Sequence, residues 1–220
     1  MKIVVFCYDF PHAKTQEGLF RLFVAGIKVD MVFAAPRVKV ATSSTVRLTP
    51  QGMSLLHPRD ICARMDKPYL VTPHKEVWGK WDLGVILGAR ILPKKTIDKF
   101  SIGILNMHPG MLPTNRGLDN VLRAVLLRCP QGVTAHLINE KVDAGLLVAR
   151  NVIPVYEDDT PMDVSMRLQN KEMEMLVEAI NLASWPSHSQ LEEKGSCAPL
   201  TCSESNQALI DFDVYLKEFA

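Results

Sequence analysis

The chain has 220 residues and a formal net charge of +1, with 47% hydrophobic and 22% charged residues. These are ordinary globular values, and they predict one domain with at most a small appendage and enough apolar residues for a sizeable core. The balanced charge gives no electrostatic basis for binding DNA over a broad surface, and no apolar run approaches the ~18 residues of a membrane-spanning helix.

The first residues predict two strands joined by a helix. Residues 2–8 are apolar and rich in β-branched side chains, which is typical of a central parallel strand buried on both faces. A helix is predicted over 17–27 and a second strand over 29–35. The loop before this helix has no glycine ahead of Gly18, so it lacks the glycine-rich turn that binds phosphate in dinucleotide folds.

The next segment, residues 36–57, shows no periodicity and carries Arg37, Lys39 and Arg47. A solvated connection is favoured over a ligand-binding loop, because scattered basic residues in loops usually face water. A short helix is predicted from Pro58 to residue 65, followed by a short strand over 69–72.

The middle of the chain alternates strands and helices. Strands are predicted over 82–88 and 102–108, with a helix over 92–100 between them. This alternation predicts an open, mostly parallel, twisted α/β sheet, in which ligands bind beyond the carboxyl ends of the strands. Residues 88–91 and 106–110 both follow strands, so we expect them to line one crevice.

Further elements are predicted after this crevice. A helix over 117–127 precedes a strand over 132–139, and a strand over 146–155 is expected to run antiparallel to it because the loop between them is short. A long helix to residue 182 is capped by Thr160. Its inward face is predicted from helical spacing to hold Met162, Met166, Met173, Leu176, Val177 and Ile180.

Residues 185–207 lose all periodicity and read as a loose tail, before a terminal helix over 208–220. Five cysteines are scattered along the chain, and Cys197 and Cys202 have no spacing or helper residues that suit a metal site. We therefore expect buried, reduced thiols and no metal. Because the chain begins directly with a strand, we expect no signal peptide and a cytoplasmic location.

Three polar residues form a candidate catalytic set. Asn106 and His108 end the strand over 102–108 at positions i and i+2, so their side chains point the same way before Pro109 and Gly110 turn the chain. Asp143 lies in the short loop that follows a neighbouring strand. Each has a structural alternative: a core histidine, a turn asparagine and an Asx turn. Their shared position at strand ends favours a functional interpretation.

The same stretches resemble a known family. Residues 87–117, LGARILPKKTIDKFSIGILNMHPGMLPTNRG, and 132–150, GVTAHLINEKVDAGLLVAR, resemble the 10-formyltetrahydrofolate-dependent formyltransferases. The shared pattern is N-x-H-P-x-x-L-P-x-x-R-G, a strand and then V-D-x-G. The resemblance covers residues 82–182 well and 1–35 only as a general fold. It implies a Rossmann-like catalytic domain over 1–183 and a C-terminal extension over 184–220 packed on the core, where Leu209–Phe212 is similar to an I-D-W segment of the family.

The resemblance implies a role for each member of the set. Asn106 and a protonated His108 would bind the formyl oxygen as it gains negative charge, and Asp143 would orient His108 and relay the amine proton. The formyl donor would be 10-formyltetrahydrofolate, and no metal would be needed. By the same resemblance, backbone groups of Leu87, Gly88, Arg90, Ile91, Asn139 and Val142 would hold the pterin, with Leu92 and Ile104 as apolar walls. Arg116 matches the family pattern, with a structural role as the alternative.

The acceptor amine is narrowed by elimination. The missing phosphate loop counts against glycinamide ribonucleotide, and the short tail and low charge count against methionyl-tRNA. We therefore expect a small-molecule amine as the acceptor, and most of all a nucleotide-linked amino sugar. The alternatives that stay open are a methionyl-tRNA or glycinamide ribonucleotide formyltransferase, a formyltetrahydrofolate hydrolase, and a non-catalytic folate-binding protein on the same scaffold. A homodimer through the tail is compatible with the sequence.

Overall fold

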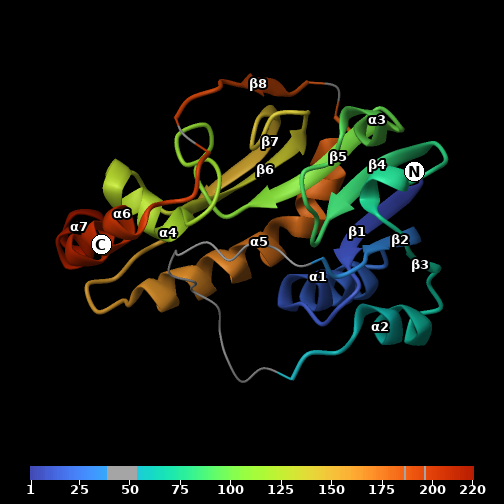
Figure 1. Cartoon of the computed structure of the whole chain (residues 1–220), viewed down its shortest axis with the longest axis horizontal. Coiled ribbons are helices and arrows are strands. Elements are labelled where there is room, and N and C mark those ends of the chain that lie inside the picture. The colour runs from blue at the N-terminus through green and yellow to red at the C-terminus, as the bar shows by residue number, and fades with distance from the viewer. Residues whose placement is uncertain (39–53, 186, 196) are drawn as a thin grey trace.

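The computed structural model describes residues 1–38, 54–185, 187–195 and 197–220, and it is an α/β structure built on one open sheet (Figure 1). The described strands are β1 (Ile3–Tyr8), β2 (Val29–Ala35), β3 (Tyr69–Val71), β4 (Trp81–Ile86), β5 (Phe100–His108), β6 (Gly132–Ile138), β7 (Gly145–Val152) and β8 (Ser189–Leu191). The helices are α1 (Ala13–Val24), α2 (Pro58–Arg64), α3 (Lys94–Ile97), α4 (Asn120–Leu127), α5 (Pro161–Ala183), α6 (Cys202–Ile210) and α7 (Phe212–Phe219), with a 3-10 turn, η1 (His74–Glu76). The predicted basic loop residues Lys39 and Arg47 lie outside the described residues.

The described strands have the order β3-β2-β1-β4-β5-β6-β7-β8. The pairs from β3 to β5 are parallel, and the pairs from β5 to β8 are antiparallel. The mostly parallel α/β sheet and the antiparallel β6–β7 pair are therefore confirmed. The antiparallel β5–β6 pair was not predicted. It arises because residues 109–131, with α4, return the chain to the sheet at the same end where β5 stops, which sets Asn106 opposite His136.

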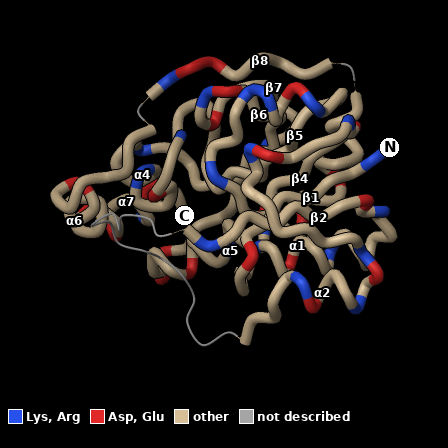
Figure 2. Tube along the Cα trace, turned by 45° about the vertical axis from the view of Figure 1, so that its right-hand side comes forward, with Lys and Arg blue, Asp and Glu red and all other residues tan. Residues whose placement is uncertain are grey.

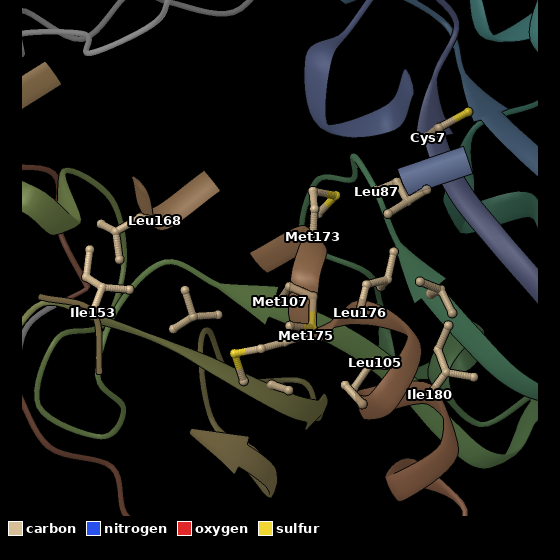
Figure 3. Packing of buried hydrophobic residues seen from close by; sticks show 14 of the residues in the cluster. Cys7, Leu87, Leu105, Met107, Ile153, Leu168, Met173, Met175, Leu176 and Ile180 are labelled. Carbon is tan, nitrogen blue, oxygen red and sulfur yellow. The ribbon is translucent and has the colours of Figure 1, made fainter. Parts of the chain in front are cut away.

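The central strands of the sheet are buried on both faces. On one face, α1 and α5 cover a large apolar cluster, in which Met107 of β5 lies beside Met175 and Leu176 of α5 (Figure 3). On the other face, a smaller cluster includes Phe6 and Ile104, both fully buried. This explains why the central strands are continuous apolar runs without a polar alternation.

Helix α5 begins as predicted. The Thr160 hydroxyl accepts a hydrogen bond from the Asp163 N–H, and the Asp163 carboxylate accepts one from the Thr160 N–H, forming a capping box. Its predicted inward face is only partly right, because Met166 is 44% exposed. The buried face is wider and includes Val164, Leu168, Met175 and Ala179, since α5 packs against α1, α4 and three strands.

Three helix boundaries differ from the predictions. Helix α1 begins at Ala13 and ends at Val24, so both ends lie earlier than in the predicted span 17–27. The helix predicted over 92–100 is reduced to Lys94–Ile97, because Phe100 already pairs with Trp81 as the start of β5. The predicted start at residue 117 is wrong as well, since Gly117 and Asp119 have φ of +84° and +61°, outside the helical region.

The tail is ordered over more of its length than its composition indicated. β8 pairs with β7, and α6 begins at Cys202 with Thr201 and Glu204 as a capping box. Helices α6 and α7 pack against α4, where the buried Tyr215 donates to the Cys129 carbonyl at 2.8 Å. Basic and acidic residues are interspersed along the described trace (Figure 2). Within the described ranges, no helix has the length and apolar character to cross a membrane.

Candidate active site

The carboxyl end of β5 presents Asn106 and His108 on one face of the sheet, opposite the face that carries Met107. His136 of β6 lies directly across from Asn106, and the Asn106 Nδ2 is 3.2 Å from the His136 Nε2. Gly110 follows in the turn, where an added Cβ would lie 2.7 Å from both the Asn115 carbonyl oxygen and the His108 Nε2. Glycine at this position therefore leaves room for the imidazole of His108.

His108 is 4% exposed and has a partner at each ring nitrogen. Its Nδ1 faces the Asp143 Oδ1 at 3.4 Å, and its Nε2 donates to the Asn115 carbonyl at 2.7 Å. The Asn120 Nδ2 is 3.1 Å from the same Nε2 and donates to the Asn115 Oδ1. A ring placed between a carboxylate and a carbonyl is held in one orientation.

Asp143 sits in the loop between β6 and β7 with φ of +46°, a left-handed conformation that is uncommon for residues other than glycine. Its Oδ2 accepts the Gly117 N–H at 2.7 Å, and its Oδ1 faces His108. The same Oδ1 is 3.9 Å from the His136 Nε2. The structure thus brings Asn106, His108 and Asp143 together, with His136 between them.

His136 is fully buried, and burial together with the neighbouring His108 lowers the pKa of His136 to about 4. The ring is therefore neutral at pH 7. Its Nδ1 lies 3.1 Å from the Ala144 carbonyl, which can only accept, so Nδ1 carries the proton and Nε2 accepts from Asn106. Sequence reasoning missed His136. The signal was an imidazole inside an apolar strand, but its importance depends on the antiparallel pairing with β5.

An ion pair between a half-buried lysine and a buried glutamate lies behind the same strand end. The Lys14 Nζ donates to the Glu172 Oε1 at 2.6 Å and to the Met107 carbonyl at 2.7 Å. Met107 is the residue between Asn106 and His108, so Lys14 ties α1 and α5 to the backbone that carries both side chains. Glu172 is 2% exposed. A carboxylate spaced four residues from Leu168 and from Leu176, both on the apolar face of α5, was the missed signal.

The residues predicted to contact the pterin fall into two groups. Leu92 and Ile104 are buried together in the smaller apolar cluster, while Leu87 is buried in the larger one against α1. Gly88 lies under the Tyr8 ring, where a Cβ would come within 2.9 Å. The structure therefore brings Leu92 and Ile104 to one place but turns Leu87 towards the opposite face.

The remaining predicted contacts lie on loops. Ile91 is 75% exposed, and the Arg90 guanidinium donates to the Val38 carbonyl at 3.4 Å. The Asn139 Oδ1 accepts the Lys141 N–H at 2.9 Å, and Asn139 lines two adjoining cavities of about 480 and 360 Å³. The Val142 carbonyl accepts from Arg116. Among the described residues, no group of three His, Cys, Asp or Glu side chains is arranged to hold a metal ion.

The segment that carries these residues is similar to a known protein family. Residues 82–180 match the family model described as "Formyl transferase", and this range contains Asn106, His108, His136 and Asp143. Over these residues the chain is similar to the formyl transferase family. The resemblance seen in the sequence is thereby confirmed.

Two curated relatives in this family have different names. The phosphoribosylglycinamide formyltransferase of Haemophilus influenzae is 32% identical over 121 residues, which are 54% of this chain and 56% of the relative. A methionyl-tRNA formyltransferase of Coxiella burnetii is 28% identical over 177 residues, 79% of this chain and 55% of the relative. The chain thus spans about half the length of the curated family members that it matches.

Solved structures of similar proteins share the fold. An N-formyltransferase from Helicobacter canadensis, in complex with folinic acid and dTDP-3-aminofucose, has a TM-score of 0.66 at 15% identity, covering 100% of this chain and 82% of that one. Glycinamide ribonucleotide transformylase 1 from Symbiobacterium toebii has a TM-score of 0.60 at 20% identity, covering 82% and 86%. These matches confirm the predicted formyltransferase-type α/β fold.

Proposed function

We propose that the protein is an N-formyltransferase that moves a formyl group from 10-formyltetrahydrofolate to a primary amine. One observation carries this proposal: Asn106, His108 and Asp143 meet at the end of β5 inside the segment that matches the formyl transferase family. An amide donor, an imidazole and a carboxylate gathered at one place can stabilise an oxyanion and move a proton, which are two requirements of acyl transfer to an amine.

Asn106 is the oxyanion donor in this mechanism. One of its two amide hydrogens is bound to His136, which sets the plane of the amide and leaves the other hydrogen for the formyl oxygen. His108 supplies the second donor and a positive charge, with the formyl oxygen replacing the Asn115 carbonyl at Nε2. Donors that are held in place before the reaction need no reorganisation as charge develops.

Asp143 acts on the proton that the attacking amine must lose. Its Oδ1 faces His108, and the Gly117 N–H holds its Oδ2, so the carboxylate is fixed in orientation. It stabilises the charged His108 and accepts the amine proton through water, and the leaving N10 nitrogen of the folate takes up a proton as its bond to the formyl carbon breaks. The bound folate supplies the activated formyl group, and the other roles belong to the side chains of this chain.

The cavity beside Asn139 is compatible with a folate. Its volume of about 480 Å³ lies within the ~300–1,000 Å³ usual for small-molecule sites. Ile97 and Ile138 give it apolar walls, and Asn139 gives it a polar edge. We propose that Asn139, which lines this cavity, contacts the cofactor together with Val142 and the segment from Gly88 to Leu92.

For the acceptor we favour a nucleotide-linked amino sugar. Where a glycine-rich phosphate loop would follow β1, this chain has Tyr8 and Phe10, whose rings stack with centroids 5.0 Å apart. Arg37 lies over the Phe10 ring at 5.9 Å. Aromatic faces with an adjacent guanidinium suit a nucleobase with a phosphate better than a bare sugar phosphate. The Helicobacter canadensis N-formyltransferase, which shares this fold and was solved with dTDP-3-aminofucose, supports the same class.

A direct assay tests this function. The protein is incubated with 10-formyltetrahydrofolate and with one amine at a time, and release of tetrahydrofolate is followed by ultraviolet absorbance. The amines are dTDP- and UDP-linked amino sugars, glycinamide ribonucleotide and methionyl-tRNA, with Asp143→Asn protein as the inactive control. Among these amines, we expect turnover only with a nucleotide-linked amino sugar.

The other outcomes have distinct meanings. Turnover with glycinamide ribonucleotide or methionyl-tRNA would overturn the acceptor assignment but keep formyl transfer. Turnover without an amine would indicate a hydrolase. Tight folate binding without turnover on any amine would leave a non-catalytic folate-binding protein and refute the enzyme.

A further inference from the structure

Arg116 is a buried cation whose hydrogen-bond partners are backbone carbonyls. The residue is 6% exposed. The Nη2 donates to the Val142 carbonyl at 2.5 Å, and the Nη1 reaches the Lys194 carbonyl at 3.5 Å. Within the described part of the chain, no carboxylate forms an ion pair with it, and its buried Nε has no hydrogen-bond partner. Burying a charge under these conditions costs free energy, which points to a role for the contacts that it makes.

Gly117, the residue after Arg116, contacts Asp143, the residue after Val142. Arg116 holds the carbonyl of Val142, and the N–H of Gly117 holds the carboxylate of Asp143 at 2.7 Å. Two consecutive residues of one loop thus bind two consecutive residues of another. Gly117 has φ of +84°, and a Cβ there would lie 2.6 Å from the Cys197 carbonyl, so its conformation is also constrained.

The backbone at Asp143, next to the Val142 carbonyl that Arg116 binds, has an unfavourable conformation. Asp143 has φ of +46°, which is unfavourable for a side chain other than glycine and persists only when the surroundings impose it. The same conformation aims the Asp143 Oδ1 at the His108 Nδ1 at 3.4 Å. A relaxed backbone at Val142 and Asp143 would turn the carboxylate away from the imidazole.

We propose that Arg116 is a positioning residue for the reaction, because it fixes the Val142 carbonyl and so keeps the carboxylate of Asp143 aimed at His108. This inference rests on the proposed function only in the measurements of kcat and KM, which require formyl transfer. It assigns to the arginine of the N-x-H-P-x-x-L-P-x-x-R-G pattern a task in orienting the aspartate of the V-D-x-G loop.

Arg123 provides a matched control. It is 7% exposed and, like Arg116, donates to two carbonyls, those of Leu118 at 3.2 Å and Ala198 at 2.5 Å. Both arginines therefore tie the segment after β8 to the region before and within α4. Of the two arginines, only Arg116 has a described hydrogen bond to the loop that carries Asp143. A purely architectural role would make the two arginines equivalent.

The experiment compares Arg116→Ala, Arg116→Lys and Arg123→Ala with the unaltered protein, by kcat, KM and thermal unfolding. We expect Arg116→Ala to lower kcat by about 10²-fold, the loss that follows when a reacting group is displaced by ~1 Å. KM should change less than threefold, and added guanidinium should restore part of the rate. Arg123→Ala should lower the melting temperature comparably and leave kcat within about threefold. Equal loss of kcat in both alanine variants would overturn the proposal.

A double-mutant cycle tests whether Arg116 acts through Asp143. In the Asp143→Asn background, Arg116→Ala should lower the remaining rate by less than about twofold, because the positioned carboxylate is already gone. If the rate losses of Arg116→Ala and Asp143→Asn instead multiply in the double variant, the inference is refuted.

Amide exchange at Gly117, measured by NMR, gives a readout that needs no turnover. Exchange should accelerate about tenfold or more in Arg116→Ala and stay unchanged in Arg123→Ala. If the unaltered protein transfers no formyl group, the proposed function fails, but this measurement still tests whether Arg116 positions the loop of Asp143. Unchanged exchange at Gly117 in Arg116→Ala would contradict that positioning role.

Discussion

The Asn106 side chain donates a hydrogen bond to the Nε2 of His136, 3.2 Å away on the neighbouring antiparallel strand. The direction of this bond follows from the neutral ring of His136, whose Nδ1 proton is given to the Ala144 carbonyl. An amide that is free to rotate would present its oxygen or its nitrogen to a substrate with similar ease. His136 removes that freedom, and the consequence can be measured.

Substitution of His136 should lower the rate through Asn106. We expect His136→Phe to reduce kcat by about 10- to 100-fold, while Asn106→Ala removes the donor and reduces it by ~10²–10³-fold with folate affinity largely kept. The pair should not be additive, since His136 acts by orienting Asn106. Steady-state kinetics of the two single variants and the double variant checks this. A double variant that loses the product of both factors would contradict the orienting role.

Acid should destabilise the fold through His136. Its pKa is lowered from the ordinary 6.5 to about 4, mainly by burial. The unfolded state then binds more protons between these values, so this contribution to stability is complete above pH 6.5 and is lost as the pH falls towards 4. Burial also lowers the pKa of His12 and of His74, so more than one histidine contributes in this window.

The share of His136 is found by comparison with His136→Gln. The free energy of unfolding should fall by up to about 3 kcal/mol more in the unaltered protein than in this variant between pH 6.5 and pH 4. Urea unfolding at a series of pH values measures the difference. Parallel pH profiles for the two proteins would show that His136 does not titrate in this way.

The pair formed by Lys14 and Glu172 should be asymmetric under substitution. Lys14→Met leaves the Glu172 carboxylate, 3% exposed, without its cation, and should lower the free energy of unfolding by about 3 kcal/mol. Lys14→Met combined with Glu172→Met should recover much of that loss, because the buried carboxylate is then replaced together with its half-buried partner by apolar groups of similar volume. Denaturant titration of the single and double variants decides this, and equal stability of Lys14→Met and the unaltered protein would rule out a stabilising pair.

Gly110 should tolerate no side chain. In Gly110→Ala the new Cβ would lie 2.7 Å from the His108 Nε2 and from the Asn115 carbonyl, so the imidazole must move. We expect a loss of about 1–3 kcal/mol in stability and a drop in kcat of at least 10-fold. Gly26→Ala is the control, because it has φ of +69° with nothing within 4 Å of the added Cβ. It should lower stability through backbone strain alone and leave kcat unchanged.

Much of this site could be predicted from local pattern. The apolar run that ends in Asn106 and His108 marked a buried strand with two aligned polar groups, because side chains alternate along a strand. The capping box at Thr160 and Asp163 was equally legible, since both partners lie within one helical turn. The spacing of the family pattern also indicated that Asp143 would join the set, and the structure places it 3.4 Å from His108.

Other parts depended on partners that are distant in the sequence. His136 gained its role only because residues 109–131 return to the same end of the sheet, which makes β6 antiparallel to β5. Lys14 and Glu172 meet across 158 positions, so no local period could pair them. The start of α4 moved to Asn120 because Gly117 is drawn out of a helical conformation while its N–H binds Asp143.

By itself, the sequence indicated most of the elements and the candidate catalytic side chains, because hydrophobic periodicity and turn chemistry act within a few residues. The tertiary structure alone decided the direction of β6, the neutral state of His136 and the left-handed backbone of Asp143. Strand pairing, burial and backbone strain are set by what the rest of the chain packs against them. The orientation of Asn106 and His108 is therefore a property of the folded sheet.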